Sequence, residues 1–271
     1  MKKIIVLLLA PLLFVACSRN AVTGRKQLNL LPESQLQQMS LTQYQTFLSQ
    51  NKVIPVSGSK DAEMVKRVGT RIANAITNYY TKQGKGDVLN GYKWEFNLVD
   101  SKEVNAWCMP GGKVVVYTGL LAVTQNETAL AIVLGHEITH AVAQHGNERM
   151  SQELIAQGIG VAGDVLTSKN AQVNNIFNST YGAGAQVGVL LPNSRKQEYE
   201  ADHFGLLFAA MAGYDPREAI PFWQRMQALG ANGQKPPEFL STHPSDENRI
   251  SRLQGYMDEA LKYYKQSGKT N

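Results

Sequence analysis

The sequence predicts a mostly helical α+β fold in which helices surround a small antiparallel sheet. Apolar residues recur at helical spacing in long segments before residue 83 and after residue 126, whereas strand-like runs gather between residues 93 and 118. Strands that are grouped in this way, instead of alternating with helices, favour an α+β plan over repeated βαβ units. The chain has 271 residues, 43% of them hydrophobic, which is enough to bury one sizeable core.

The N-terminal residues are typical of an export signal followed by a lipid attachment site. Lys2 and Lys3 precede the apolar run 4–15, which is too short to cross a bilayer as a helix. Cys17 follows the small residue Ala16, as in the lipobox of bacterial lipoproteins, whose cysteine carries the lipid. An ordinary cleaved signal with a chance cysteine behind it is the alternative interpretation.

The lipoprotein interpretation divides the chain into three regions. We expect a signal peptide at 1–16, a polar and turn-rich lipid-anchored tether at 17–31, and one folded domain at 32–271. Lipid on Cys17 would hold the protein to a membrane without any spanning helix. We therefore expect it in the cell envelope of a bacterium, facing the periplasm, with the outer membrane favoured.

The charge of the chain argues against nucleic-acid binding, and its cysteines argue against an intrachain disulfide and a cysteine nucleophile. The net charge is only +5, and no basic stripe with interleaved aromatic residues indicates a nucleic-acid partner. If Cys17 carries lipid, Cys108 is the other of two cysteines and no intrachain disulfide can form. Cys108 stands in a strand-like run without a histidine near it in the sequence, so we interpret it as a structural thiol and not as a nucleophile.

The elements follow in order from the apolar spacing. A helix of about 17 residues opens at Pro32, and a second helix occupies residues 61–82. A strand at 93–99 is followed by a hairpin whose turn is Pro110-Gly111-Gly112. The segment 167–193 is rich in Asn, Gly and Ser and could cover a cleft. The hairpin strands are expected at 104–109 and 113–118, and further helices at 148–166, 194–212, 216–229 and 246–266.

The helix that begins at Asn126-Glu127 carries the strongest chemical motif of the chain. His136, Glu137 and His140 form His-Glu-x-x-His, and residues four apart on a helix project from one face. Two imidazoles one turn apart suit a tetrahedral zinc ion, and Glu137 lies beside them, where it can exchange a proton with a zinc-activated water. The rest of this helix is apolar, and burying three ionisable groups is costly unless they are paired or bind metal.

A third zinc ligand is expected from the acidic stretch that starts at Glu198. Glu198 and Asp202 share one helix face with the small residues Ala201 and Gly205, which permit close approach to the histidine helix; Glu200 points to the opposite side. Glu198 is therefore the expected ligand, and Asp202 the acceptor that orients a ligating imidazole. An acidic first turn at a helix surface is the alternative interpretation.

These motifs together resemble the HtpX-like zinc metallopeptidases, which include the CAAX prenyl endopeptidases. The closer likeness is to their soluble periplasmic lipoprotein-type and BepA-type members, from about residue 33 to 260. It rests on His-Glu-x-x-His, on Glu-x-x-Ala-Asp at 198–202, on Asn105-Ala106 and the Gly111-Gly112 turn, and on Thr242-His243-Pro244-Ser245. The resemblance implies a gluzincin-like fold, one zinc ion on His136, His140 and Glu198, Glu137 as general base, and an edge strand after Asn105 that holds extended substrates.

The expected function is that of a membrane-tethered zinc endopeptidase that cleaves unfolded or misassembled envelope proteins. In the family His243 lies near the metal, and we expect it to act in catalysis, either by stabilising the oxyanion or by binding zinc as an inhibitory fourth ligand. His145 is five residues after His140, which favours a structural hydrogen bond, and Arg249 could support a carboxylate near the site. The alternatives are a chaperone-like protein with a structural metal, which needs no Glu137, and an amino- or carboxypeptidase.

Overall fold

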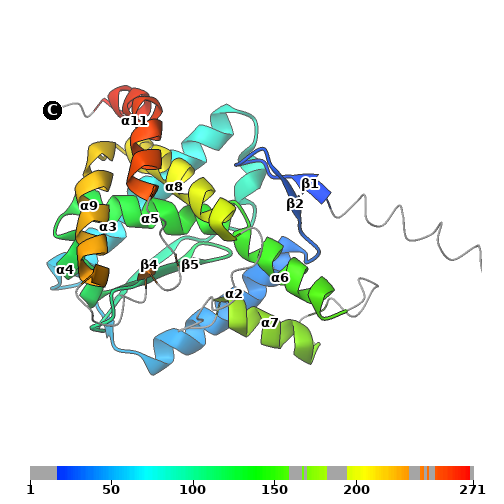
Figure 1. Cartoon of the computed structure of the whole chain (residues 1–271). Coiled ribbons are helices and arrows are strands. Elements are labelled where there is room, and N and C mark those ends of the chain that lie inside the picture. Colours follow the sequence, from blue (N-terminus) through cyan, green and yellow to red (C-terminus); the bar gives the residue numbers. More distant parts are fainter. Residues whose placement is uncertain are drawn as a thin grey trace, which may run out of the picture.

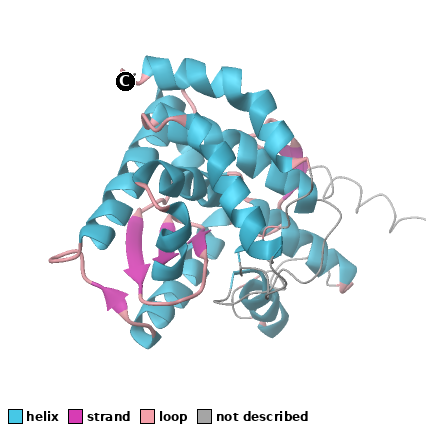
Figure 2. Ribbon diagram, turned by 60° about the vertical axis from the view of Figure 1, so that its left-hand side comes forward, coloured by secondary structure: helices cyan, strands magenta, loops and turns pink. Residues whose placement is uncertain are grey.

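The computed structural model confirms the predicted fold class. Helices lie around a small sheet (Figures 1 and 2), and the helix of the His-Glu-x-x-His motif, labelled α5 (Glu127–Val142), crosses the middle of the molecule (Figure 1). Among the described residues, no helix combines the length and the apolar character needed to cross a lipid bilayer. The structure describes residues 17–158, 167, 170–181, 194–231, 239–240, 243 and 248–268.

A helix lies at each place where the sequence predicted one, but the structure also has the helices α4 (Thr118–Thr124) and α7 (Ala171–Tyr181), and the helix expected at 148–166 spans His145–Ala156. The segment 167–193 was expected to form a cover; its residues Ala171–Tyr181 form helix α7, and most of the rest lies outside the described residues. The helical segments are α2 (Glu33–Gln50), α3 (Lys60–Lys82), η1 (Gly86–Leu89), α4 (Thr118–Thr124), α5 (Glu127–Val142), α6 (His145–Ala156), α7, α8 (Ser194–Met211), η3 (Pro216–Glu218), α9 (Ala219–Ala231) and α11 (Arg249–Gln266).

The main sheet is mixed, so the expectation of a purely antiparallel sheet was wrong in this detail. Its order is β3-β4-β6-β5, in which β6 pairs parallel with β4 and antiparallel with β5. The apolar pattern could not show this, because all five residues of β6 are buried whichever neighbour they have. The pairing leaves β5 at one edge of the sheet. The strands are β3 (Val53–Ile54), β4 (Glu95–Val99), β5 (Ala106–Met109) and β6 (Lys113–Tyr117).

The expected hairpin turn joins β5 to β6. Gly111 and Gly112 have φ values of +82° and +79°, a left-handed backbone that glycine adopts at little cost. Cys108 lies in β5 as a buried free thiol, and burial raises its pKa well above the usual value. It is therefore a structural thiol, as expected.

Helix α5 lies at the centre of the largest apolar core. The side-chain oxygen of Asn126 caps its first turn by accepting a hydrogen bond from the Ala129 amide at 2.8 Å. Every residue from Ala129 to Val142 is buried, as its almost uninterrupted apolar sequence requires. Helices α3 and α8 and strand β5 all pack against it. The motif residues are thus presented on a helix that is fixed on all sides.

Helices α5 and α8 cross at two glycines. A Cβ atom on Gly135 would lie 2.4 Å from the carbonyl oxygen of Gly205, and one on Gly205 would lie 2.6 Å from the amide nitrogen of His136. Both distances are too short for any larger residue, so the small face predicted for α8 is what brings the two backbones together. This contact sets Glu198 and Asp202 beside the histidines.

The N-terminal segment, which we expected to be a polar tether, is folded against the helical body from residue 19 onward. Strands β1 (Cys17–Arg19) and β2 (Lys26–Leu28) form an antiparallel hairpin. The Asn20 side chain donates a 2.9 Å hydrogen bond to the Ala143 carbonyl at the end of α5. Residues 1–16, the expected signal peptide, lie outside the described residues.

Candidate metal centre

Four side chains converge on a point between α5 and α8. His136, His140, Glu198 and His243 each offer one ligand atom, and all four atoms lie within 4.8 Å of one another. The Nε2 atoms of His136 and His140 are 3.1 Å apart, and each is 3.4 Å from a Glu198 oxygen. The Nδ1 atom of His243 is 3.3 Å from His136 Nε2 and 3.2 Å from Glu198 Oε2.

These separations match the geometry that zinc requires. Ligand atoms about 2.0–2.1 Å from a tetrahedral ion are separated from each other by about 3.3–3.4 Å. Five of the six pairs among the four side chains have separations from 3.1 to 3.4 Å, close to that value. Two imidazoles and a carboxylate are also a ligand set that zinc prefers, so these residues fit the expected cofactor.

The buried charges indicate that the site is built for a cation. Burial would raise the Glu198 pKa, but the facing imidazoles of His243 and His140 lower it well below its usual value. Burial lowers the pKa of His140 and opposes a charge on His136, yet hydrogen bonds with Asp202 and Glu198 raise the His136 pKa to about 9. The carboxylates Glu198 and Asp202 thus favour a buried positive charge at this point, which a divalent metal supplies.

Glu137 lies beside the four potential ligands with one free oxygen. It is buried, and its Oε1 atom accepts no hydrogen bond from any described residue. The Nε2 atom of His243 is 3.4 Å from that oxygen. Burial raises the Glu137 pKa, which makes this carboxylate a better proton acceptor than a solvated one. A buried oxygen without a partner next to a metal site is what a general base needs.

His136 is held by the carboxylate that the sequence assigned to this role. Its Nδ1 atom lies 3.0 Å from Asp202 Oδ1, which also accepts a hydrogen bond from Arg249 Nη2 at 2.5 Å. Arg249 is buried and its guanidinium stacks 3.4 Å above the Trp223 ring. The sequence suggested Arg249 only as a possible support, because nothing in the spacing showed that α11 would pack its first residue against α8.

His140 is held by residues that sequence reasoning placed elsewhere or missed. Its Nδ1 atom lies 2.9 Å from Nδ1 of His145, as expected of a structural hydrogen bond. The other nitrogen of His145 lies 3.0 Å from Glu200 Oε2. Glu200 does point away from the zinc side of α8, yet it reaches the site through His145. The spacing of five between His140 and His145 was the one signal in the sequence for this connection.

The comparisons with known proteins agree with this site. A profile of peptidase family M48 matches residues 59–257. The Bos taurus protein named metalloendopeptidase OMA1, mitochondrial, is 32% identical over 265 residues, which cover 94% of this chain and 49% of the relative. Mitochondrial metalloendopeptidase OMA1 of Saccharomyces cerevisiae is 33% identical over 186 residues, 66% of this chain and 52% of the relative.

A bacterial relative is similar as well. The beta-barrel assembly-enhancing protease of Yersinia pestis is 34% identical over 184 residues, which cover 65% of this chain and 38% of the relative. The chain thus spans about half, or less, of the length of the curated relatives it matches. The HtpX-like and CAAX prenyl endopeptidases to which the motifs pointed represent a related branch of the M48 family, so the expectation was correct at the level of the family.

These comparisons contradict the expected location in a bacterial cell envelope. The relatives from yeast, cow and human are named as mitochondrial proteins, and the two mammalian ones match over 94% of this chain. The expectation depended on residues 1–17, a short apolar run with basic and small neighbours. Such a pattern is a matter of composition and is a weaker indication of location than similarity along the folded domain.

Proposed function

We propose that this chain, which belongs to peptidase family M48, is a zinc metalloendopeptidase that cleaves unfolded or misassembled proteins with Glu137 as general base. One observation carries the proposal. The ligand atoms of His136, His140 and Glu198 are 3.1 to 3.4 Å apart, close to the edge lengths of a zinc tetrahedron, and Glu137 lies beside them with an oxygen that accepts no hydrogen bond from a described residue. A structural metal site would not need that buried carboxylate, which argues against a chaperone-like protein that keeps metal for stability.

Zinc bound by these residues would polarise the scissile carbonyl and lower the pKa of the attacking water. Glu137 would take the proton from that water and pass it to the leaving amine. Asp202 and Arg249 would hold His136 in one orientation throughout, since the three groups form a connected buried chain. We assign His136, His140 and Glu198 as the metal ligands and Asp202 as the group that orients His136.

The edge position of β5 supports an extended substrate. A strand at the edge of a sheet has backbone groups on one side that can pair with another chain. β5 also packs against α5, so a peptide added along it would run past the histidine helix. Pairing through backbone groups recognises an unfolded segment without regard to most of its side chains, which favours selection of substrates by unfoldedness.

Digestion of unfolded casein tests the proposed activity. We expect the protein to produce internal fragments of casein, and we expect a chelator to stop the reaction and added zinc to restore it. Internal fragments distinguish an endopeptidase from an amino- or carboxypeptidase, which would release single residues from the ends. Casein that stays intact with the zinc-loaded protein would contradict the proposal.

His243 lies beside the three expected ligands, with its ligand atom within 4.8 Å of theirs. Its Nδ1 atom is as close to His136 and Glu198 as the other ligand atoms are to each other, and its backbone amide is fixed by a 2.9 Å hydrogen bond to the Phe239 carbonyl. This is the position that the attacking water needs in a zinc peptidase. We therefore assign His243 as an inhibitory fourth ligand that must move aside, in preference to an oxyanion donor.

Replacing His243 by alanine is expected to leave the zinc content at one ion per chain and to raise kcat for casein. The fourth position is then open to water, while the three other ligands are unchanged. Metal analysis and steady-state kinetics measure the two effects, with His203→Ala on the outer part of α8 as a control. A fall in kcat with full zinc content would instead assign His243 to oxyanion stabilisation, and unchanged kinetics would exclude both roles.

We also propose that lipid on Cys17 tethers the enzyme to a membrane. The proposal depends on the apolar segment 4–15 followed by Ala16-Cys17. Cys17→Ala is expected to move the mature protein from the membrane fraction to the soluble fraction with casein cleavage retained, because Cys17 is remote in sequence from the metal ligands. Fractionation followed by immunoblotting measures this. A variant that remains with membranes after removal of residues 1–16 would contradict the lipid anchor.

A further inference from the structure

The two imidazoles of the His-Glu-x-x-His motif are each supported by a chain of groups that ends in an arginine, which is buried for Arg249 and partly buried for Arg25. For His136 the chain is short and runs through Asp202 to Arg249. For His140 it is one residue longer and runs through His145 and Glu200 to Arg25, which comes from the N-terminal hairpin β1–β2. A carboxylate behind a zinc-bound imidazole fixes both the tautomer and the ring orientation.

The chain behind His140 allows one consistent direction for its hydrogen bonds. An imidazole that binds metal through Nε2 carries its proton on Nδ1, so His140 donates to Nδ1 of His145 across 2.9 Å. The remaining proton of His145 is then on Nε2, which donates to Glu200 across 3.0 Å. Glu200 in turn accepts from Nε of Arg25 at 2.6 Å. Every donor therefore meets an acceptor from the metal outward.

Arg25 holds two carboxylates together at the end of this chain. Its guanidinium bonds Glu200 and also pairs with both oxygens of Glu148 at 2.6 Å. The three side chains are largely buried, with 11%, 14% and 2% of the Arg25, Glu200 and Glu148 side-chain surface exposed. Hydrogen bonds to these carboxylates raise the Arg25 pKa above its already high value, although burial opposes this. Without Arg25, two negative groups would face each other in a poorly solvated space.

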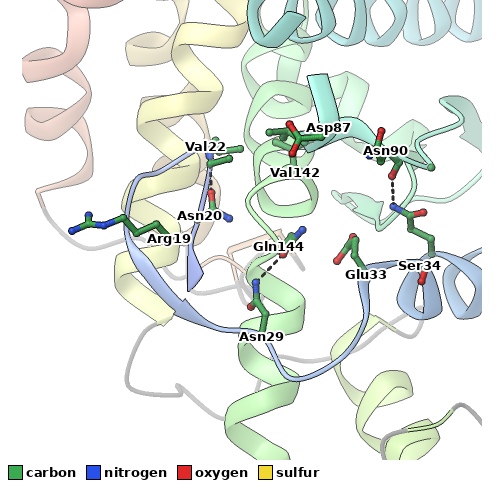
Figure 3. A pocket seen from close by; sticks show the side chains of 14 residues that line it. Arg19, Asn20, Val22, Asn29, Glu33, Ser34, Asp87, Asn90, Val142 and Gln144 are labelled. Atoms are coloured by element: carbon green, nitrogen blue, oxygen red, sulfur yellow. Dashed lines mark hydrogen bonds between the residues drawn. The ribbon is translucent and has the colours of Figure 1, made fainter. Parts of the chain in front are cut away.

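The same hairpin also fixes the turn between α5 and α6 that presents His145. Asn20 and Gln27 both donate to the Ala143 carbonyl, at 2.9 and 3.0 Å. Asn29 donates to the side chain of Gln144 at 2.8 Å, beside a cavity of about 430 Å³ (Figure 3). Gln144 has a left-handed backbone with φ of +55°, an uncommon conformation for this residue that the surrounding contacts maintain.

We infer that Arg25, Glu200 and His145 are positioning residues for His140, so that the N-terminal hairpin completes the zinc site. Arg25 lies outside the segment 59–257 matched by the family profile, and the inference extends the site beyond that segment. It rests on the proposed role of His140 as a zinc ligand. These residues should raise the zinc affinity, because a His140 imidazole that is free to rotate no longer keeps its Nε2 atom directed at the metal.

The first test changes Glu200 to glutamine and measures the zinc dissociation constant by competition with a chromogenic chelator. We expect binding weaker by roughly 10- to 100-fold, which is the usual effect of removing a partner behind a metal ligand. The visible absorption spectrum of the cobalt-substituted protein should change as well, since it reports the arrangement of ligands around the metal. Glu259→Gln is the matched control, because Glu259 pairs with His203 on the exposed side of α8 at 2.8 Å and is far from the ligands in this network.

The second test changes Arg25 in the hairpin. Arg25→Met should weaken zinc binding by several-fold to about tenfold, and Arg25→Lys should recover part of that loss because the positive charge remains. Arg19→Met in the same hairpin is the control, since Arg19 is exposed and donates to the Gly24 carbonyl within the hairpin. Circular dichroism and thermal melting in the presence of chelator show whether each variant is folded, independently of metal.

The results separate this inference from the proposed function. If the parent protein cleaves casein with zinc and folded Glu200→Gln or Arg25→Met binds zinc as tightly as the parent, the inference is wrong and the proposed function stands. If the parent protein shows no zinc-dependent cleavage but the two variants lose zinc affinity as expected, the positioning role stands and the proposed function fails. Equal losses in the Arg19 and Glu259 controls would also overturn the inference.

Discussion

Replacing Glu137 by glutamine is expected to reduce kcat for casein by about 10²- to 10⁴-fold while one zinc ion per chain remains bound. The amide has the size of the carboxylate but cannot accept a proton from the attacking water. Glu137 makes no contribution to the ligand set, and its Oε1 atom has no hydrogen-bond partner among the described residues. The substitution therefore removes a catalytic group without removing a hydrogen bond of that oxygen to a described residue.

Stability should respond in the opposite direction to activity in this variant. Burying a carboxylate is costly when one of its oxygens accepts no hydrogen bond, as for Glu137 Oε1, and burial raises the Glu137 pKa although the His243 imidazole lies 3.4 Å away. Glu137→Gln is therefore expected to melt at a temperature equal to or higher than that of the parent. Glu63→Gln on the exposed side of α3 is the control for a change of charge alone. Near-normal casein cleavage by zinc-loaded Glu137→Gln would refute the assignment of the general base.

Local periodicity accounts for the parts of the site that the sequence predicted. The helix of His136 and His140, and the shared face of Glu198, Asp202 and Gly205, follow from the helical repeat alone. The structure adds that Gly135 faces Gly205, so the small residues of both helices contribute to their close approach. A spacing rule suffices here because each of these relationships lies within one helix.

Relationships between distant segments were not predictable in this way. The parallel pairing of β4 with β6 depends on β5, which lies between them in the sequence, taking its place at the edge of the sheet. The fully buried residues of β6 do not indicate which strands are its neighbours. Arg25 was assigned to a tether because its segment is polar and rich in turns. The polar residues of this segment instead donate hydrogen bonds to the carbonyl of Ala143 and to the carboxylates of Glu148 and Glu200. Only folding brings these groups near the segment.

The assignment of Glu198 on α8 as a zinc ligand predicts a large loss of zinc when this residue is replaced. Glu198→Ala is expected to lose zinc. Its zinc affinity should fall by more than roughly 100-fold, which is the largest usual loss when a residue that supports a metal ligand is removed. The Glu198 oxygens lie 3.4 Å from the Nε2 atoms of both His136 and His140, and they are the carboxylate contribution to the four-residue cluster. Its removal leaves two imidazoles and His243, a neutral set that compensates less of the zinc charge.

Glu200→Ala is the matched comparison, because it removes the same side chain two residues away on the same helix. It should weaken zinc binding through His145 and His140, yet the protein should still contain metal after dialysis against zinc-free buffer, whereas Glu198→Ala should not. Casein cleavage should be abolished in Glu198→Ala and reduced in Glu200→Ala. The order follows from the geometry, since one carboxylate touches the metal position and the other reaches it through two imidazoles. Metal analysis that found zinc retained in Glu198→Ala and lost in Glu200→Ala would reverse the assignment of ligand and support.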